Sequence, residues 1–139
     1  MKISLTRPEA KRIVRWFRGQ FGLMDWAVTV QIQDDPPDWL DADLVSDGTV
    51  AVCNPELIHE QASIWVSNSR CQAADSSPVA ALIHELFHTL LTKAGIKGDT
   101  AVRAETVWNR LDQSLERLYY VDVLIGMEKR KRRTVDGHR

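Results

Sequence analysis

The pattern of apolar and polar positions predicts one helix near the start of the chain. Between residues 6 and 21, apolar side chains recur at helical spacing among lysines and arginines. Thr6 is suited to cap this helix, Pro8 fits its first turn, and Gly22 lies where the helix should end. We therefore expect an N-terminal helix with one apolar face.

Short strands are expected next. The segment WAVTVQIQ, residues 26–33, alternates apolar and polar side chains, which is typical of a half-buried strand. Two consecutive prolines then end regular structure. The segments GTVAVCN (48–54) and ASIWVSN (62–68) are interpreted as two more strands, and residues 69–78 as a loop. The sequence thus predicts a small antiparallel sheet of about three strands.

Two helices should follow this sheet. Ser77 is a strong N-cap and Pro78 suits a first helical position, so a helix should run to about residue 94, where the segment AGIKGD supplies two glycines. From about residue 101 to residue 126, apolar residues recur at spacings of three and four, which predicts a second helix. If the connecting turn is tight, the two helices are antiparallel. The expected fold class is α+β.

Composition fits one small globular domain. The chain has 139 residues, of which 44% are hydrophobic and 27% charged. Its formal net charge of -1 argues against a general nucleic-acid binder, but Lys129 to Arg133 form a basic run. We expect residues 1–126 to form a single domain and residues 127–139 a basic C-terminal tail. That tail is a candidate contact for nucleic acid or an acidic partner.

The sequence carries no signal for a membrane or a secretory route. No stretch approaches the roughly 20 apolar residues that span a bilayer, and the N-terminal segment becomes charged too early for a signal peptide. Two cysteines, Cys53 and Cys71, are too few for a disulfide framework. We expect a cytoplasmic protein with reduced thiols and no membrane partner.

The chemistry concentrates in the segment AALIHELFHTLL, residues 80–91. His84 and His88 are four residues apart, so on a helix both imidazoles project from one face and can reach a single Zn²⁺. Glu85 is rotated about 100° from His84 and can reach a metal-held water as general base. These three residues form the H-E-x-x-H motif. The bland alternative, an amphipathic core helix, would bury two stacked imidazoles without any compensating partner.

A catalytic zinc site needs a third protein ligand and one open position. His88 lies six residues before the expected helix end at Ala94, and Glu105 lies six residues after Asp99, where the next helix can begin. In an antiparallel hairpin both would lie roughly 9 Å from the turn. We therefore expect Glu105 to be the third ligand, with Asp112 in reserve about 10 Å, or two turns of helix, further along.

These motifs resemble the zincin-like metallopeptidases. The H-E-x-x-H segment followed by AETVWNRL at residues 104–111 is similar to the gluzincin pattern, and the order of elements is similar to the minimal zincins of phage and prophage genomes. The resemblance covers roughly residues 24–120, with a firm motif only at His84, Glu85 and His88. It implies a zinc-dependent peptide hydrolase in which the strand at 62–68 lines the cleft and holds an extended peptide substrate as an added strand.

The sequence leaves two questions open: the residue that stabilises an oxyanion, and the choice between rival functions. The donor that would stabilise an oxyanion is not identified, and Tyr119, Tyr120 and His59 are candidates. The rival functions are a zinc hydrolase acting on another amide, and a non-catalytic module that binds a peptide or nucleic acid or uses zinc only as a staple. A closed structural site would need a fourth ligand, for which Cys71 or His59 would serve.

Overall fold

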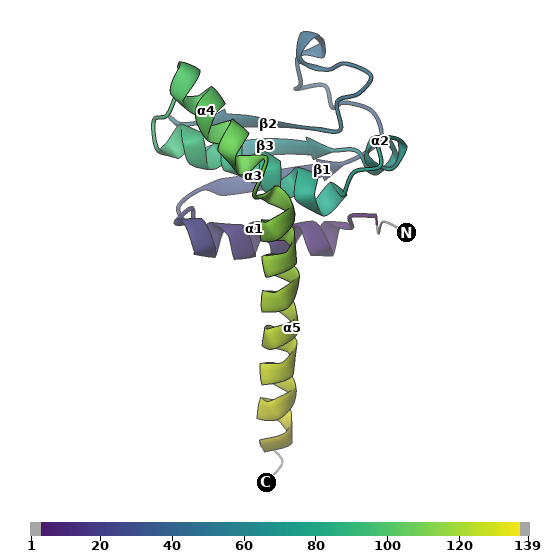
Figure 1. The fold of residues 1–139 in the computed structure, drawn as a ribbon, viewed down its shortest axis with the longest axis vertical. Helices are drawn as coiled ribbons and strands as arrows, with labels where there is room; N and C mark the ends of the chain where they lie inside the picture. Colours follow the sequence, from purple (N-terminus) through teal and green to yellow (C-terminus); the bar gives the residue numbers. More distant parts are fainter. Residues whose placement is uncertain (1–3, 137–139) are drawn as a thin grey trace.

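The computed structural model describes residues 4–136, without the side chains of residues 127, 128 and 131–136. The predicted α+β class is confirmed (Figure 1). The elements, in chain order, are α1 (Arg7–Phe21), β1 (Ala27–Ile32), the short 3-10 helix η1 (Ala42–Leu44), β2 (Ala51–Glu56), β3 (Gln61–Val66), α2 (Asn68–Ala73), α3 (Pro78–Lys93), α4 (Gly98–Trp108) and α5 (Asp112–Asp136). None of the helices in the described part of the chain is long and apolar enough to cross a membrane.

Helix α1 has the ends that its sequence predicts. The Thr6 side chain accepts a hydrogen bond from the Glu9 backbone N–H, which satisfies one of the unpaired donors of the first turn. Gly22 ends the helix with a φ of 71°, a left-handed conformation that glycine adopts without steric cost. The buried face is formed by Ala10, Ile13, Val14 and Phe17.

The sheet has three strands in the order β1-β3-β2, and it is mixed. Strands β2 and β3 form an antiparallel hairpin, but β1 and β3 are parallel, so the prediction of a fully antiparallel sheet was wrong. The reason is the long excursion between β1 and β2, which returns the chain to the far side and lets β3 insert between the other two strands. The strand at 62–68 is consequently central rather than an edge, and Trp65 is fully buried.

The segment 69–78 was interpreted as a loop, and that was also wrong. Residues Asn68–Ala73 form α2, capped by the Ser67 side chain, which accepts from the Arg70 backbone N–H. Six residues are too few for a periodic apolar pattern, so only the cap could have indicated this helix.

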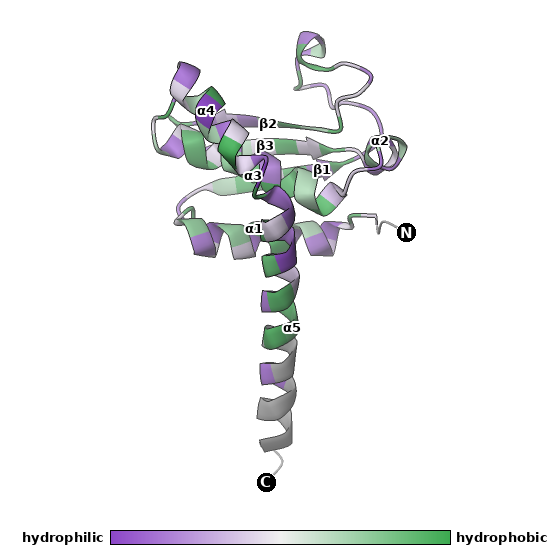
Figure 2. Cartoon of the chain, in the orientation of Figure 1, coloured by the Kyte–Doolittle hydropathy of each residue, from purple (hydrophilic) through white to green (hydrophobic). Residues whose placement is uncertain are grey.

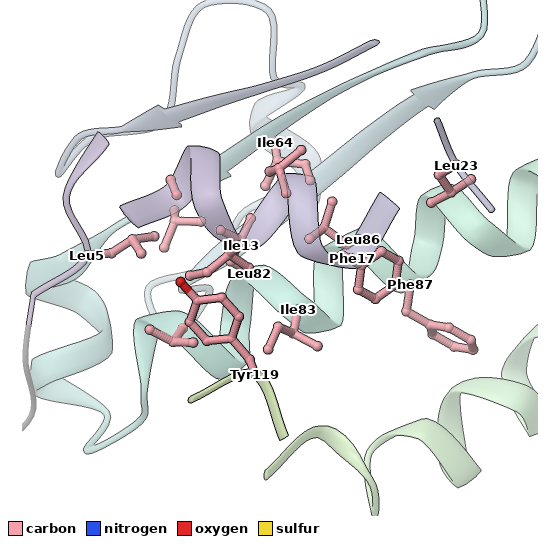
Figure 3. Close-up of a cluster of buried hydrophobic side chains, with 14 of the residues drawn as sticks. Leu5, Ile13, Phe17, Leu23, Ile64, Leu82, Ile83, Leu86, Phe87 and Tyr119 are labelled. Atoms are coloured by element: carbon pink, nitrogen blue, oxygen red, sulfur yellow. The ribbon is translucent and has the colours of Figure 1, made fainter. Parts of the chain in front are cut away.

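Helices α1 and α3 pack against the sheet and against each other to form the core (Figure 3). Ile13 and Phe17 from α1 meet Leu82 and Leu86 from α3, with Ile64 of β3 beside them. All five side chains are fully buried. Helix α3 therefore lies in the middle of the protein, and whatever chemistry it carries is held on a rigid element.

The predicted helix from residue 101 to residue 126 is instead two helices, α4 and α5, separated at Asn109–Leu111. Helix α4 begins after Lys97, which makes no side-chain cap, rather than after Asp99. Helix α5 runs on through the expected tail to Asp136 and projects far beyond the rest of the molecule (Figure 1). The break lets Trp108 dock on α3 while the next helix takes a different direction across the protein, as a straight helix could not.

Ser77 joins α3 to α5 as well as capping α3. Its hydroxyl oxygen accepts from the Ala80 backbone N–H, and its O–H donates to the Glu116 carboxylate at 2.7 Å. We expect Ser77→Ala to lower the free energy of unfolding by about 1–2 kcal/mol, because both the cap and the interhelical hydrogen bond are lost. Ser77→Thr keeps the hydroxyl and should restore most of that loss in urea unfolding. Equal losses in both variants would contradict this double role.

Candidate metal centre

Helix α3 presents two imidazoles on one face, as the four-residue spacing predicts. The ring centroids of His84 and His88 are 5.2 Å apart, one helical turn along the axis. Their side chains are 21% and 32% exposed, so both reach the surface although more than half of the residues of the helix are buried. The strong N-cap at Ser77 and the apolar neighbours that face the core set this orientation.

Glu105 of α4 reaches both imidazoles. Its Oε1 lies 3.2 Å from Nε2 of His84 and 3.4 Å from Nε2 of His88. The donor atoms of these three residues all lie within 4.8 Å of one another. Within the described residues, Asp112 does not join this group; it begins α5 and its carboxylate accepts from the Gln113 backbone N–H. The structure therefore brings together His84, His88 and Glu105, and leaves the reserve ligand apart.

The spacing fits a tetrahedral ion. Two ligands bonded to Zn²⁺ at about 2.0–2.1 Å with a tetrahedral angle are separated by about 3.3–3.4 Å. The two distances from Glu105 to the histidines, 3.2 and 3.4 Å, lie on either side of this value. Two imidazoles and one carboxylate are also the donor set that catalytic zinc sites use. The residues present thus fit a zinc ion, although the same contacts also allow a hydrogen bond between Glu105 and a histidine.

Trp108 holds α4 in the position that this contact requires. It lies three residues after Glu105, and its ring stacks on Phe87 with centroids 4.1 Å apart and an interplanar angle of 4°. Edge contacts with Phe17 and Phe21 complete an aromatic cluster that ties α4 to both α3 and α1. Because Phe87 is the residue before His88, the stack fixes the carboxylate relative to the imidazoles. In the sequence, the only sign of this role is that Trp108 lies three residues after Glu105.

Glu85 lies beside His84 on α3 and is directed toward β2. It is only 8% exposed and accepts a hydrogen bond from the Cys53 backbone N–H. Burial, reinforced by the negative charge of Glu105, raises the pKa of Glu85 to about 8, despite the opposing effect of that hydrogen bond. A carboxyl group with a pKa in this range exchanges protons readily near neutral pH, which suits a general base.

The Cys53 side chain fastens β2 to α3 beside this group. Its Sγ lies 3.4 Å from the hydroxyl of Thr89, which is fully buried one turn after Glu85. Burial raises the pKa of the Cys53 thiol to about 12, so the thiol stays protonated and acts as a packing group. Cys53 and Cys71 are not joined in a disulfide. Nothing in the sequence indicates that Cys53, a strand residue, would contact the motif glutamate.

A cleft of about 790 Å³ opens beside His84 and Glu85. Its walls are the start of β2 (Val50 and Ala51), the first half of α3, and α5 from Asp112 to Tyr120. The hydrogen bond between Ser77 and Glu116 lies in this wall and holds α5 against α3. The candidate base and one candidate ligand, His84, therefore border one open space that is large enough for several residues of a peptide.

The other candidate residues, proposed as oxyanion donors or as a fourth ligand, differ in whether they line the cleft. Tyr120 lines the cleft, whereas Tyr119 is buried against Trp16. His59 lies in the turn between β2 and β3 and contacts Glu56, outside the cleft lining. Neither His59 nor the buried Cys71 belongs to the ligand group found among residues 4–136. That group has three members, so no fourth protein ligand closes it in the described structure.

Comparison of the chain with protein-family models, with curated proteins and with solved structures gives no significant match.

Replacement of Trp108 tests whether the aromatic stack positions Glu105. We expect Trp108→Ala to lower the free energy of unfolding by about 3–5 kcal/mol and to weaken zinc binding, measured by competition with a chromophoric chelator. Trp108→Phe should keep most of the stacking and of the zinc affinity; it also removes an indole N–H that lacks a hydrogen-bond partner in the described structure. Trp39→Ala, at a loop residue that is 36% exposed, is the matched control. Unchanged zinc affinity in Trp108→Ala would contradict the positioning role.

The raised pKa of Glu85 predicts a pH dependence of the metal-free protein. Between about pH 4.5 and pH 8 the folded state holds a proton that the unfolded state has released, so this residue makes the free energy of unfolding fall as the pH rises. Burial lowers the pKa of His88, which has the opposite effect at the acidic end. The difference between the protein and Glu85→Gln isolates the glutamate, with a slope of at most about 1.4 kcal/mol per pH unit. Identical pH profiles from urea unfolding would exclude the shift.

Proposed function

We propose that this protein is a zinc-dependent peptide hydrolase of the zincin type. One observation carries the proposal: Glu105 of α4 meets both histidines of α3 at the spacing of a tetrahedral zinc site, while Glu85 lines a cleft together with His84. The group has three protein ligands, which matches a catalytic site with an open position rather than a closed structural site. The gluzincin resemblance of the sequence supports the same assignment.

The four residues would have two roles: three would bind the metal ion, and one would transfer a proton. His84, His88 and Glu105 would hold the ion, which when bound supplies a Lewis acid for the scissile carbonyl and lowers the pKa of the attacking water. Glu85 accepts the proton of that water and passes it to the leaving amine. The hydrogen bond from the Cys53 backbone fixes one side of the Glu85 carboxylate and so orients it for this transfer.

An extended peptide is the substrate class that suits the cleft. Strand β2 is the edge of the sheet nearest α3, since β3 is its partner on the other side. Its start lines the cleft, so a peptide could pair with β2 while its scissile bond lies over the ligand group. The sequence assigned this role to the strand at 62–68, which is central and has both edges paired.

Four variants test the assignment. We expect Glu85→Gln to bind zinc with a stoichiometry of one and to lose at least about 100-fold in kcat, because the ligands remain and the proton carrier is gone. His88→Ala should lose both zinc and activity. Glu105→Gln should weaken zinc binding, whereas Asp112→Asn, the matched control, should not. The measurements are metal content and turnover of a panel of fluorogenic peptides and other amides.

Equal zinc content in all four variants would refute the metal site. Stoichiometric zinc without hydrolysis of any peptide, but with cleavage of another amide, would refute the peptidase assignment alone.

A further inference from the structure

Strand β2 is an edge of the sheet, so the backbone groups on its outer side are not paired with another strand. In an antiparallel pair, alternate residues bond the partner strand, and the residues between them direct their N–H and C=O groups the other way. One step before the first pair of the ladder with β3, the Ser67 N–H donates to the Val50 carbonyl at 2.9 Å. The even-numbered positions of β2 therefore bond β3. The odd-numbered positions face the outer edge: Ala51, Cys53 and Pro55.

Two of these three edge positions cannot offer an N–H to a bound peptide. The Cys53 N–H donates to the Glu85 carboxylate, which agrees with the alternation and uses this donor. Pro55 has no N–H. Ala51 alone among the three keeps both an N–H and a C=O that make no hydrogen bond to the residues that the structure describes.

The cleft extends along this edge in one direction from Glu85. Its described lining includes Val50 and Ala51 but none of residues 52–56, and it continues past the first half of α3. The facing turns of α5 are mostly hydrophilic (Figure 2), whereas the lining from β2 and α3 is mostly apolar. A peptide in the cleft is therefore expected to lie against β2, on the Ala51 side of Glu85.

We propose that the substrate is anchored to β2 at Ala51 alone and antiparallel to the strand, so that the protein recognises the residues that follow the cleaved bond. This anchoring rests on the proposed function, because it takes Glu85 as the group beside the reacting bond. In the antiparallel orientation one substrate residue exchanges two hydrogen bonds with Ala51, and such pairing is the more stable one. Since β2 runs from Ala51 toward Glu56, an antiparallel peptide passes Glu85 first and Ala51 afterwards.

The position of Glu85 sets the register of the bound peptide. The substrate residue opposite Cys53 lies beside the Glu85 carboxylate, so it belongs to one side or the other of the cleaved bond. The residue opposite Ala51 comes two positions later, roughly 7 Å along the strand. The anchored residue is therefore the second or third after the cleaved bond, and residues before that bond contribute little to affinity.

A first experiment measures binding of hydroxamates, which attach to zinc directly and need no hydrolysis. One series is a succinyl hydroxamate followed by one to three alanines, and the other is acetyl-alanine hydroxamate with one to three alanines before the hydroxamate. In calorimetry with the zinc-loaded protein, we expect an affinity gain of about 10-fold or more in the first series only, because one added alanine makes two hydrogen bonds. The succinyl unit replaces the first residue, so the first or second alanine should give the gain, and N-methylation of that alanine should remove it.

A second experiment removes the anchoring N–H from the protein. Ala51→Pro is compatible with the fold, because it is the first residue of an edge strand with an outward N–H, and Pro55 already occupies an equivalent position in β2. We expect this variant to lose the gain in the succinyl series while it binds zinc and acetohydroxamate as before. Ala51→Ser keeps the N–H and is the matched control, and urea unfolding should show both variants folded.

Three results would overturn the anchoring at Ala51: equal gains in both series, a gain that Ala51→Pro leaves intact, or N-methylation that is tolerated at every alanine. A protein that binds neither zinc nor acetohydroxamate would overturn the metal site and this anchoring together. A protein that shows the one-sided gain but hydrolyses no peptide would keep the anchoring and lose only the peptidase assignment.

Discussion

Helix α3 is buried on most of its surface and yet carries three titratable side chains, and the neighbouring elements are arranged around that constraint. A buried ionisable group is costly unless a partner or an ion compensates it. Here α4 supplies Glu105 to the two histidines, and β2 supplies a backbone N–H to Glu85. The compensation differs because the two histidines are partly exposed, whereas Glu85 is buried against β2 at the border of the cleft.

That difference is what separates the two chemical roles on one helix. His84 and His88 keep enough exposure to bind an ion together with a side chain from outside the core. Glu85, one residue from His84 but rotated toward β2, is desolvated, and burial raises its pKa to about 8. A rigid helix thus fixes the candidate ligands and the candidate base relative to each other, while their different surroundings set their protonation.

Local features of the fold, such as helix ends, could be predicted from the sequence better than long-range features, such as the order of the strands. The caps at Thr6 and Ser77, the α+β class and the meeting of Glu105 with the motif histidines follow from spacing and helix ends. The strand order does not, because parallel pairing of β1 with β3 depends on the path of a long loop without periodicity. The break between α4 and α5 was missed for a similar reason. Apolar spacing continues through Asn109–Leu111, and the helix ends there because Trp108 docks on Phe87.

Because of this break, the C-terminal half both lines the cleft and extends beyond the body of the protein. Had the helix continued straight from Glu105, the residues after Trp108 would have followed α4 away from α1. Because it turns, the first half of α5 closes the cleft through Glu116 and packs Tyr119 against Trp16, and the second half leaves the body. The same anchoring residues that complete the cleft wall direct Leu118, Val121 and Ile125 outward. The wall of the cleft and the exposed apolar residues therefore belong to two faces of one helix.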